Sequence, residues 1–183
     1  YFADMSTYGQ VYRLMQSGNV KIESDYAFNY FMLLCSKFLS VKYFFLLVDV
    51  FYILPCYWFS KIYFRRYWFY AFFMFVGSFS FWSYGTNGIR NGLATSIFVL
   101  ALCFYYKKKL WMYLFFVLSF FIHSSVIIPI SAFLLSGFCK NPKVYLYIWL
   151  IAIPLSLAGG GFWESLFSRI GFEDRTSGYL VNN

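Results

Sequence analysis

The residue best suited to do chemistry is Arg90, in the polar stretch 85–92. A guanidinium keeps its charge and presents a planar fork of donors that matches phosphate or carboxylate oxygens. A helix that begins at this stretch would add its positive N-terminal dipole. Arg90 is therefore a candidate anion clamp; the alternative is an arginine that extends to lipid headgroups.

His123 is the single histidine of the chain, and it lies in an apolar run beside Ser124 and Ser125. Ionisable side chains are costly at membrane depth, so one found there is by default a sign of a functional cavity. The other interpretation is a neutral imidazole that bonds to a neighbouring carbonyl group. The order of residues supports neither a Ser-His-Asp triad nor a metal site.

Three acidic residues, Asp4, Glu23 and Asp25, precede the first long apolar run. A carboxylate beside a substrate hydroxyl can act as a general base, which makes Asp25 and Glu23 catalytic candidates. Capping of a helix by Ser24 or Asp25 would explain the same residues without chemistry.

Other charged residues have less certain roles from their positions alone. Asp49 lies inside the first long apolar run, where a carboxylate is costly unless it is paired or hydrated. Arg90, or a segment outside this chain, could be its partner. Arg169 and Arg175 stand among acidic residues near the end of the chain and could form a second anion contact or belong to a solvated loop.

The composition places these residues in a membrane. Of 183 residues, 61% are hydrophobic and only 12% are charged, whereas soluble domains carry roughly 25% charged residues. A soluble monomer and a disordered chain are both excluded. The net charge of +8 does not indicate nucleic acid, because the basic residues form short clusters between apolar runs, as orientation signals of membrane proteins do.

Apolar runs of roughly 20 residues can cross a bilayer, and here they predict an all-α, polytopic membrane protein with about four full crossings. The crossings are expected at residues 41–59, 67–84, 92–106 and 144–158. Residues 1–40 are expected to form an interfacial segment with an amphipathic helix whose apolar positions include Tyr26 and Tyr30. Residues 159–183 are expected to form a polar loop.

These segments, residues 1–183, make up a single transmembrane domain that we expect to be incomplete at both ends. A polar turn is expected at residues 85–90, before the third crossing. Gly88 and Gly92 have the spacing of small residues that allow close helix packing, or that line a route for substrate.

Residues 110–138 have His123 near their middle and are too long for an ordinary crossing and too short for two. They form either one long tilted helix or a re-entrant or broken pair of half-helices that meets at the histidine.

The charges of the loops favour the pair of half-helices, which would enter the membrane and return to the same side as a hairpin. This arrangement places a set of basic residues on one face, and the positive-inside rule makes that face cytoplasmic. The set is Lys61, Arg65, Arg66, Lys107, Lys108, Lys109, Lys140 and Lys143. Residues 1–40, 85–90 and 159–183 then share the opposite, outer face, where any chemistry is expected.

Several motifs together resemble the EpsG-like family of bacterial polysaccharide polymerases, which is related to Wzy-type O-antigen polymerases. They are Gly88-Ile89-Arg90-Asn91-Gly92-Leu93-Ala94, the lysine cluster, Phe121-Ile122-His123-Ser124-Ser125, Ala3-Asp4 with Tyr8 and Tyr12, and Glu23-Ser24-Asp25-Tyr26 with Phe31. The family usually has glutamine where this chain has Asn91, whose amide arm is shorter.

The resemblance implies a multi-pass protein of the bacterial inner membrane that makes O-antigen, capsule or exopolysaccharide. Such a glycosyltransferase-type enzyme joins oligosaccharides linked to polyprenyl diphosphate at the outer face, and it meets membrane lipid and other polysaccharide-assembly proteins. Arg90 would hold the diphosphate leaving group, Asp25 or Glu23 would deprotonate the acceptor hydroxyl, and His123 would shape or protonate the cavity. Asn91, Asp4, Arg169 and Arg175 are further substrate-binding candidates.

No metal or other cofactor is implied, and no nucleic acid. Two other functions fit the same residues. In a transporter or flippase for lipid-linked glycans, Asp49, Arg90 and His123 would line a permeation route. In a non-catalytic membrane scaffold, the face of Gly88 and Gly92 would pack against a partner.

Overall fold

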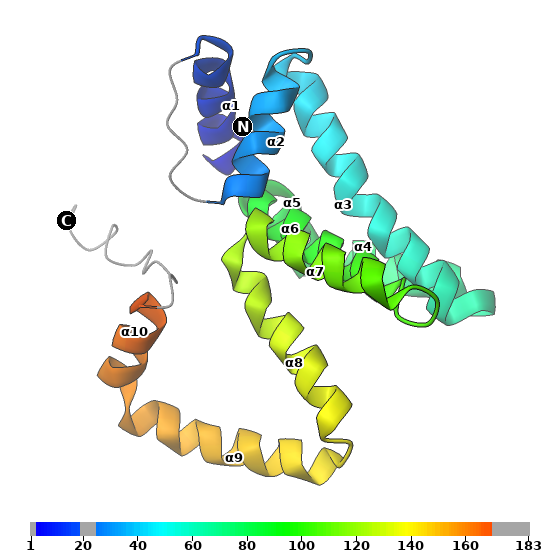
Figure 1. Ribbon diagram of the computed structural model, residues 1–183, viewed down its shortest axis with the longest axis vertical. Helices are drawn as coiled ribbons and strands as arrows, with labels where there is room; N and C mark the ends of the chain where they lie inside the picture. Colours follow the sequence, from blue (N-terminus) through cyan, green and yellow to red (C-terminus); the bar gives the residue numbers. More distant parts are fainter. Residues whose placement is uncertain (1–2, 19–24, 170–183) are drawn as a thin grey trace. The chain divides into compact units, whose positions relative to one another are not determined.

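The computed structural model describes residues 3–18 and 25–169, and every regular element in these two ranges is a helix. Contacts divide the chain into residues 1–127, here called unit 1, and residues 128–183, called unit 2. The elements, drawn in Figure 1, are α1 (Ala3–Gln16), α2 (Tyr26–Ser36), α3 (Val41–Phe64), η1 (Arg65–Tyr67), α4 (Trp68–Gly77), α5 (Phe79–Asn87), α6 (Ile89–Leu102), α7 (Lys109–Ile122), η2 (Ser124–Val126), α8 (Ile127–Phe138), α9 (Pro142–Ala158) and α10 (Gly160–Arg169).

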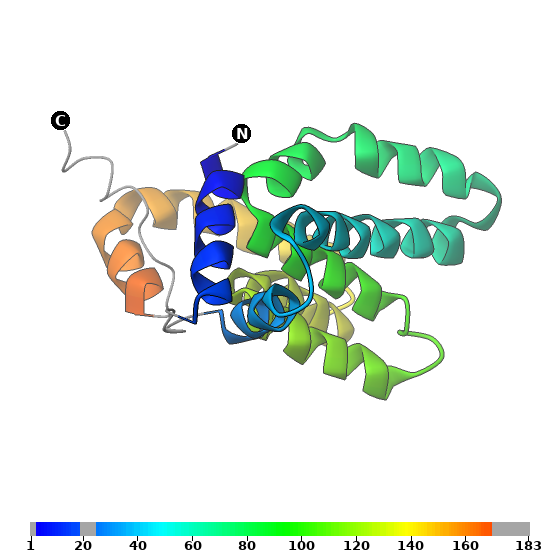
Figure 2. The same ribbon diagram turned by 90° about the horizontal axis from the view of Figure 1, so that it is seen from above.

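The longest helix is α3, with 24 residues, which at about 1.5 Å per residue is long enough for a bilayer core of about 30 Å. It continues through the buried Pro55. At Arg65 the chain adopts φ 39° and turns back, so that α4 runs antiparallel beside α3 (Figure 2). Within the described ranges, the one stretch with the length and composition of a membrane span is Val41–Gly77, while α6 and α7 have 14 residues each.

The predicted first crossing is confirmed as a helix and is longer than expected. The predicted second crossing is divided, because the helix breaks at Ser78 and restarts there with the Ser78 hydroxyl accepting a hydrogen bond from the Phe81 amide at 3.2 Å. The predicted polar turn at residues 85–90 is wrong in extent: α5 continues through Asn87, and Gly88 alone separates it from α6.

Helix α6 is the centre of unit 1, since it packs against both α3 and α7. A Cβ on Gly92 would lie 2.9 Å from the Tyr84 carbonyl oxygen and 3.2 Å from the Tyr52 ring. Ser96 donates a hydrogen bond to the Tyr52 carbonyl oxygen at 2.7 Å. The prediction of close helix packing at Gly88 and Gly92 is therefore confirmed. The small residues let α6 approach α3 and α5 closely, and the Ser96 hydrogen bond fixes its position along α3.

Helices α1 and α2 lie beside the start of α3 (Figure 1). Their shared core is aromatic: the rings of Tyr12 and Phe44 lie 4.8 Å apart and both are fully buried, as is Phe28. The predicted helix near residue 26 is confirmed, but its buried face is the one that carries Phe28 and Met32. The stripe with Tyr26 and Tyr30 is exposed.

Of the two alternatives for residues 110–138, the single long helix is wrong, and the favoured broken pair of helices is confirmed in that the helix is interrupted near His123. Helix α7 ends at Ile122, and His123 has extended angles of φ −159° and ψ 126°. A short 3₁₀ turn, η2, follows before α8 begins. The re-entrant path of this segment through a bilayer stays a prediction.

Unit 2 consists of most of α8, together with α9 and α10. The Asn141 side chain caps α9 by accepting a hydrogen bond from the Lys143 amide at 3.0 Å, and Pro142 follows in the first turn. The predicted polar loop from residue 159 is wrong over its first part, since residues Gly160–Arg169 are helical. Trp163 bonds back to the Leu155 carbonyl oxygen at 3.2 Å across the junction.

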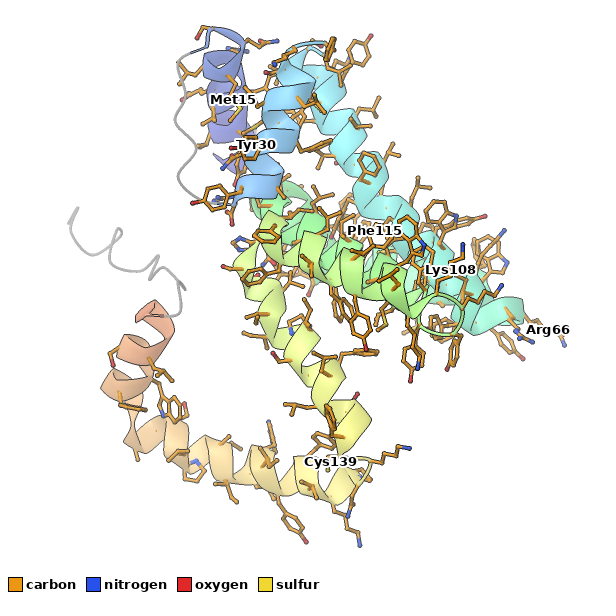
Figure 3. The ribbon with its side chains drawn as sticks, in the orientation of Figure 1. Met15, Tyr30, Arg66, Lys108, Phe115 and Cys139 are labelled. Carbon is orange, nitrogen blue, oxygen red and sulfur yellow. The ribbon has the colours of Figure 1, made fainter. Side chains whose placement is uncertain are left out.

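The helices of unit 1 have two chemically different ends. Near one end lie the turns α3–α4 and α6–α7, where Tyr63 donates a hydrogen bond to the Leu102 carbonyl oxygen at 2.7 Å. Figure 3 shows Arg66 and Lys108 toward this end. We call it the basic end and define it by Lys61, Arg65, Arg66, Lys107, Lys108 and Lys109, all of them exposed. The start of α6 and the end of α7 form the opposite end.

Candidate functional site

The site lies at this opposite end, where Asp25 bridges two other side chains. One carboxylate oxygen of Asp25 forms an ion pair with Nη1 of Arg90. Its other oxygen lies 3.3 Å from Nδ1 of His123. Asp25 is 65 positions from Arg90 and 98 positions from His123 in the sequence. Three different elements of unit 1 therefore meet here.

All three side chains are mostly removed from solvent, with exposed fractions of 13% for Asp25, 20% for His123 and 27% for Arg90. Charges that are partly desolvated interact more strongly than charges in bulk water. The remaining exposure leaves Arg90 and His123 open to a ligand.

Asp25 reaches the site because its backbone adopts a left-handed conformation, φ 46° and ψ 51°. Aspartate is among the few non-glycine residues that tolerate this region. Its carbonyl oxygen accepts a hydrogen bond from the Asn29 amide at 3.0 Å, which starts α2. Its side chain makes no capping bond, so the interpretation of Asp25 as a side-chain cap is wrong, and its carboxylate is turned to Arg90 and His123 instead.

Arg90 is the second residue of α6, directly after the junction at Gly88. Gly88 makes no side-chain cap at the start of α6, and the first-turn amides of a helix have no intrahelical acceptor. The guanidinium carbon lies 5.5 Å from the centre of the Tyr8 ring, within the range of a cation–π contact. Tyr8 and Asp25 thus hold the guanidinium on two sides.

A second hydrogen bond ties the histidine turn to α6. The Ser125 hydroxyl donates to the side-chain oxygen of Asn91 at 3.0 Å. On the other side of the break, the His123 amide donates to the Ser119 carbonyl oxygen at 3.0 Å. Asn91 and Ser125 therefore fix the end of α7 against the start of α6, and with it the distance between His123 and Arg90.

Opposing effects act on the pKa of Asp25. Partial burial raises it, but the hydrogen bond to His123 and the positive charge of Arg90 lower it by more, so the pKa of Asp25 lies below its ordinary value of 3.8. Asp25 is therefore an ionised carboxylate at neutral pH and a weak base by itself.

The structure brings together four of the predicted site residues: Asp25, His123, Arg90 and Asn91. Four others cannot be placed. Glu23 and Arg175 lie outside the described residues, as do the side chains of Asp4 and Arg169.

Two contacts were missed from the sequence. Tyr8 and Ser125 were noticed as members of motifs, but no signal in the sequence links Tyr8 to Arg90 or Ser125 to Asn91. Both links join residues from distant parts of the chain, and only the packing of α1, α6 and α7 creates them.

The suggested pairing of Asp49 with Arg90 is wrong, because Arg90 pairs with Asp25. Asp49 is exposed on α3, and among the described side chains it has no ion-pair partner. The described residues also contain no group of three or more His, Cys, Asp or Glu that could hold a metal ion.

Comparison with known proteins agrees with the resemblance noted from the motifs. The model of the EpsG family matches residues 2–183. No curated protein and no solved structure matches the chain. Because the family match covers nearly the whole chain, including Asp25, Arg90 and His123, this protein belongs to the EpsG family, whose members are membrane proteins of polysaccharide biosynthesis.

Proposed function

We propose that this protein is a polysaccharide polymerase that joins oligosaccharide units carried on polyprenyl diphosphate, at the outer face of the bacterial inner membrane. The observation that carries the proposal is the cluster of Arg90, Asp25 and His123, which combines a fixed cation with a hydrogen-bonded acid–imidazole pair. Transfer of a sugar from a diphosphate needs both: a cation for the leaving group and a group that takes a proton.

The donor diphosphate binds at Arg90. A guanidinium has five N–H donors, so pairing with Asp25 leaves others for phosphate oxygens. The start of α6 adds its uncapped amides and the positive end of its dipole. As the bond between the sugar carbon and the phosphate oxygen breaks, negative charge grows on the diphosphate, and these fixed groups stabilise it.

The acceptor hydroxyl gives its proton to His123. The lowered pKa of Asp25 makes that carboxylate a poor base, whereas a neutral imidazole has one ring nitrogen that can accept a proton. Asp25 bonds to Nδ1 of His123, which directs Nε2 to the acceptor and stabilises the imidazolium that forms. The acceptor oxygen then forms the new bond to the sugar carbon. Glu23 is a second candidate base near Asp25 in sequence.

The remaining candidates extend the site. Asn91 and Ser125 hold the histidine turn in register with Arg90, and Tyr8 supports the guanidinium and offers an aromatic ring to a sugar. Asp4, Arg169 and Arg175 are proposed as further contacts to the substrate.

The distribution of charge in unit 1 supports the outer location. The basic end and the cluster lie at opposite ends of α6 and α7. Under the positive-inside rule the basic end faces the cytoplasm, which turns the cluster outward. A multi-pass arrangement in which several of the apolar helices cross the membrane is part of this proposal.

The packing of Gly92 disfavours a scaffold function. The residue is buried, and its surroundings are the Tyr84 backbone and the Tyr52 ring of the same unit. This face is therefore already occupied within the chain. A partner could not pack on Gly92 without separating α6 from α5.

The decisive experiment replaces Arg90 by alanine and measures polymer length in cells, with Arg66→Ala at the basic end as a matched control. We expect Arg90→Ala to leave single lipid-linked units at the outer face, while Arg66→Ala makes long polymer. Accumulation of these units at the cytoplasmic face would indicate a flippase instead. Normal polymer in Arg90→Ala would refute the proposal.

A further inference from the structure

The charge of Arg90 is balanced inside the chain. Among the described side chains, Arg90 is the one arginine or lysine that forms an ion pair, and its partner is the Asp25 carboxylate. The other carboxylate oxygen of Asp25 contacts His123. An arginine and an aspartate together carry no net charge, so this pair attracts a distant anion much less than an isolated cation does.

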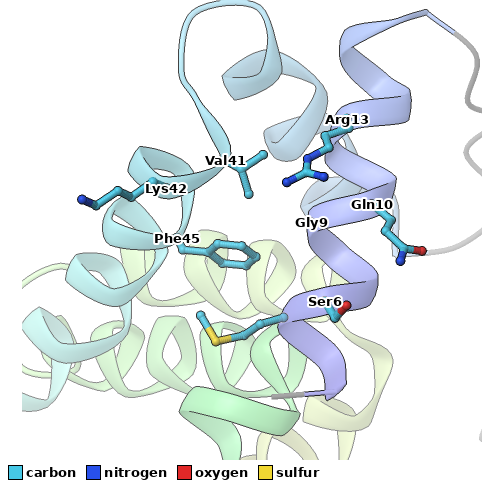
Figure 4. A pocket seen from close by; sticks show the side chains of 8 residues that line it. Ser6, Gly9, Gln10, Arg13, Val41, Lys42 and Phe45 are labelled. Carbon is cyan, nitrogen blue, oxygen red and sulfur yellow. The ribbon is translucent and has the colours of Figure 1, made fainter. Parts of the chain in front are cut away.

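Arg13 shows the opposite situation. It is an exposed arginine on α1, and no described acidic side chain pairs with it. Figure 4 shows it reaching from α1 toward Val41, at the border of a groove between α1 and the start of α3. A free guanidinium at a membrane surface can bind the phosphate of any lipid headgroup. Because a bilayer presents a large excess of headgroups, an arginine that serves one particular phosphate compound has to be protected from them.

Asp25 supplies this protection, because it already occupies Arg90. A phospholipid headgroup such as phosphatidylglycerol carries the same single negative charge as the carboxylate. It therefore gains no charge attraction by replacing Asp25, and it loses freedom of motion on binding. A headgroup that binds beside Asp25 instead meets a like charge, which is unfavourable.

A lipid-linked diphosphate has more charge to offer. It carries a negative charge on each of two phosphates, so at equal distance its attraction to the guanidinium is about twice that of a single charge. Its oxygens can also accept two parallel hydrogen bonds from one guanidinium. The contact between Asp25 and His123 gives the carboxylate a second partner when a diphosphate takes its place at Arg90.

We propose that Asp25 is a specificity-determining residue, which keeps singly charged phospholipid headgroups away from Arg90 and yields to a diphosphate. The inference rests on the proposed binding of the donor diphosphate at Arg90. It gives Asp25 a role that is separate from its support of His123. Removal of the carboxylate should therefore widen the range of anions that Arg90 accepts, without weakening its binding of a diphosphate.

The test measures binding of radiolabelled farnesyl diphosphate to the full purified chain in neutral detergent, with and without phosphatidylglycerol as a competitor. We expect phosphatidylglycerol to leave the apparent Kd of the wild type unchanged. In Asp25→Asn and Asp25→Gly it should raise the apparent Kd about tenfold, because the like charge beside Arg90 is gone. Asparagine and glycine both suit the left-handed backbone at φ 46°, so both variants should fold.

Asp49→Asn is the matched control, because it removes one acidic charge from the same unit away from the cluster. It should behave like the wild type. Equal competition by phosphatidylglycerol in the wild type and in both Asp25 variants would overturn the inference, as would weaker binding of farnesyl diphosphate alone by both variants.

A separate variant distinguishes this inference from the proposed function on which it rests. Arg90→Ala should lose the binding of farnesyl diphosphate. If the wild type does not bind this probe, or if Arg90→Ala binds it equally well, the diphosphate site itself is wrong, and the role of Asp25 in selecting the anion is wrong with it. Binding that depends on Arg90 but not on the charge of Asp25 overturns the selectivity alone.

Discussion

The basic end of unit 1 and the end that holds the cluster carry the same kinds of cationic side chain in different surroundings. At the basic end six cations are exposed, and none has an ion-pair partner among the described side chains. Lys61 instead lies 5.0 Å from the ring centres of Tyr57 and Trp68. At the other end, Arg90 is mostly buried and paired with Asp25.

The difference separates two uses of positive charge. Exposed, unpaired cations act through their number and sign, and such a set orients a protein in a membrane. A cation held by a carboxylate and an aromatic ring has a defined position, which an anion clamp requires. Residue type alone does not distinguish the two uses, so substitutions at the two ends should have very different effects.

The largest effect is expected for Asp25→Asn. The change keeps the shape of the side chain but removes the charge that pairs with Arg90 and supports His123. Loss of acid–base function typically lowers rates by about 100-fold or more. Polymer formation by purified protein in liposomes would measure this. Asp49→Asn is the matched control and should keep activity; equal activity of the two variants would contradict the assignment of Asp25.

A smaller effect is expected for Ser125→Ala, which removes the hydrogen bond to Asn91 at 3.0 Å. One such bond contributes about 1 kcal/mol, so kcat/KM should fall about fivefold, and Ser125→Thr should restore most of it. Adding Asn91→Ala to Ser125→Ala should cost little more, because both changes break the same contact. Fully additive losses would show that the two residues act separately.

Acid should weaken the fold through Asp25. Its pKa is lower in the folded protein than its ordinary value of 3.8, so the folded state favours the ionised form. That stabilisation is complete above pH 3.8 and is lost as the pH falls through the lower, folded pKa. Thermal unfolding measured between pH 2 and 6 should show this loss in the wild type. Asp25→Asn should lack this part of the pH dependence. If the variant loses as much thermal stability in acid as the wild type does, the prediction is wrong.

The smallest effect is expected at the basic end. Lys107→Gln with Lys108→Gln removes two exposed charges that have no ion-pair partner in the described part of the chain. Surface changes of this kind usually alter free energies by less than about 0.5 kcal/mol, so polymerisation should stay within about twofold of the wild type. Lys61, Arg65 and Arg66 remain in this variant, so the charge asymmetry on which the proposed orientation rests is kept. If this variant lost as much polymerisation activity as Asp25→Asn, the cations at the two ends would not differ in role.

Several local features could be predicted because they depend on neighbours in the sequence. The helices follow from the apolar runs, and the break in residues 110–138 follows from His123 with its two serines in an otherwise apolar segment. Gly92 was identified through its spacing from Gly88, and the structure confirms the close packing. Errors arose where local signals were overruled: glycines after Ala158 suggested a loop, but residues Gly160–Arg169 form a helix.

The amino-acid sequence by itself determined that this protein is helical, rich in apolar surface, and equipped with a few side chains able to handle an anion and a proton. Only the tertiary structure decided that Asp25 pairs with Arg90 and contacts His123. It also decided that Asp49 is not the partner of Arg90. The physical reason is distance along the chain. Helix periodicity and charge are properties of adjacent residues, whereas a contact across 98 positions exists only after α2, α6 and α7 have packed together.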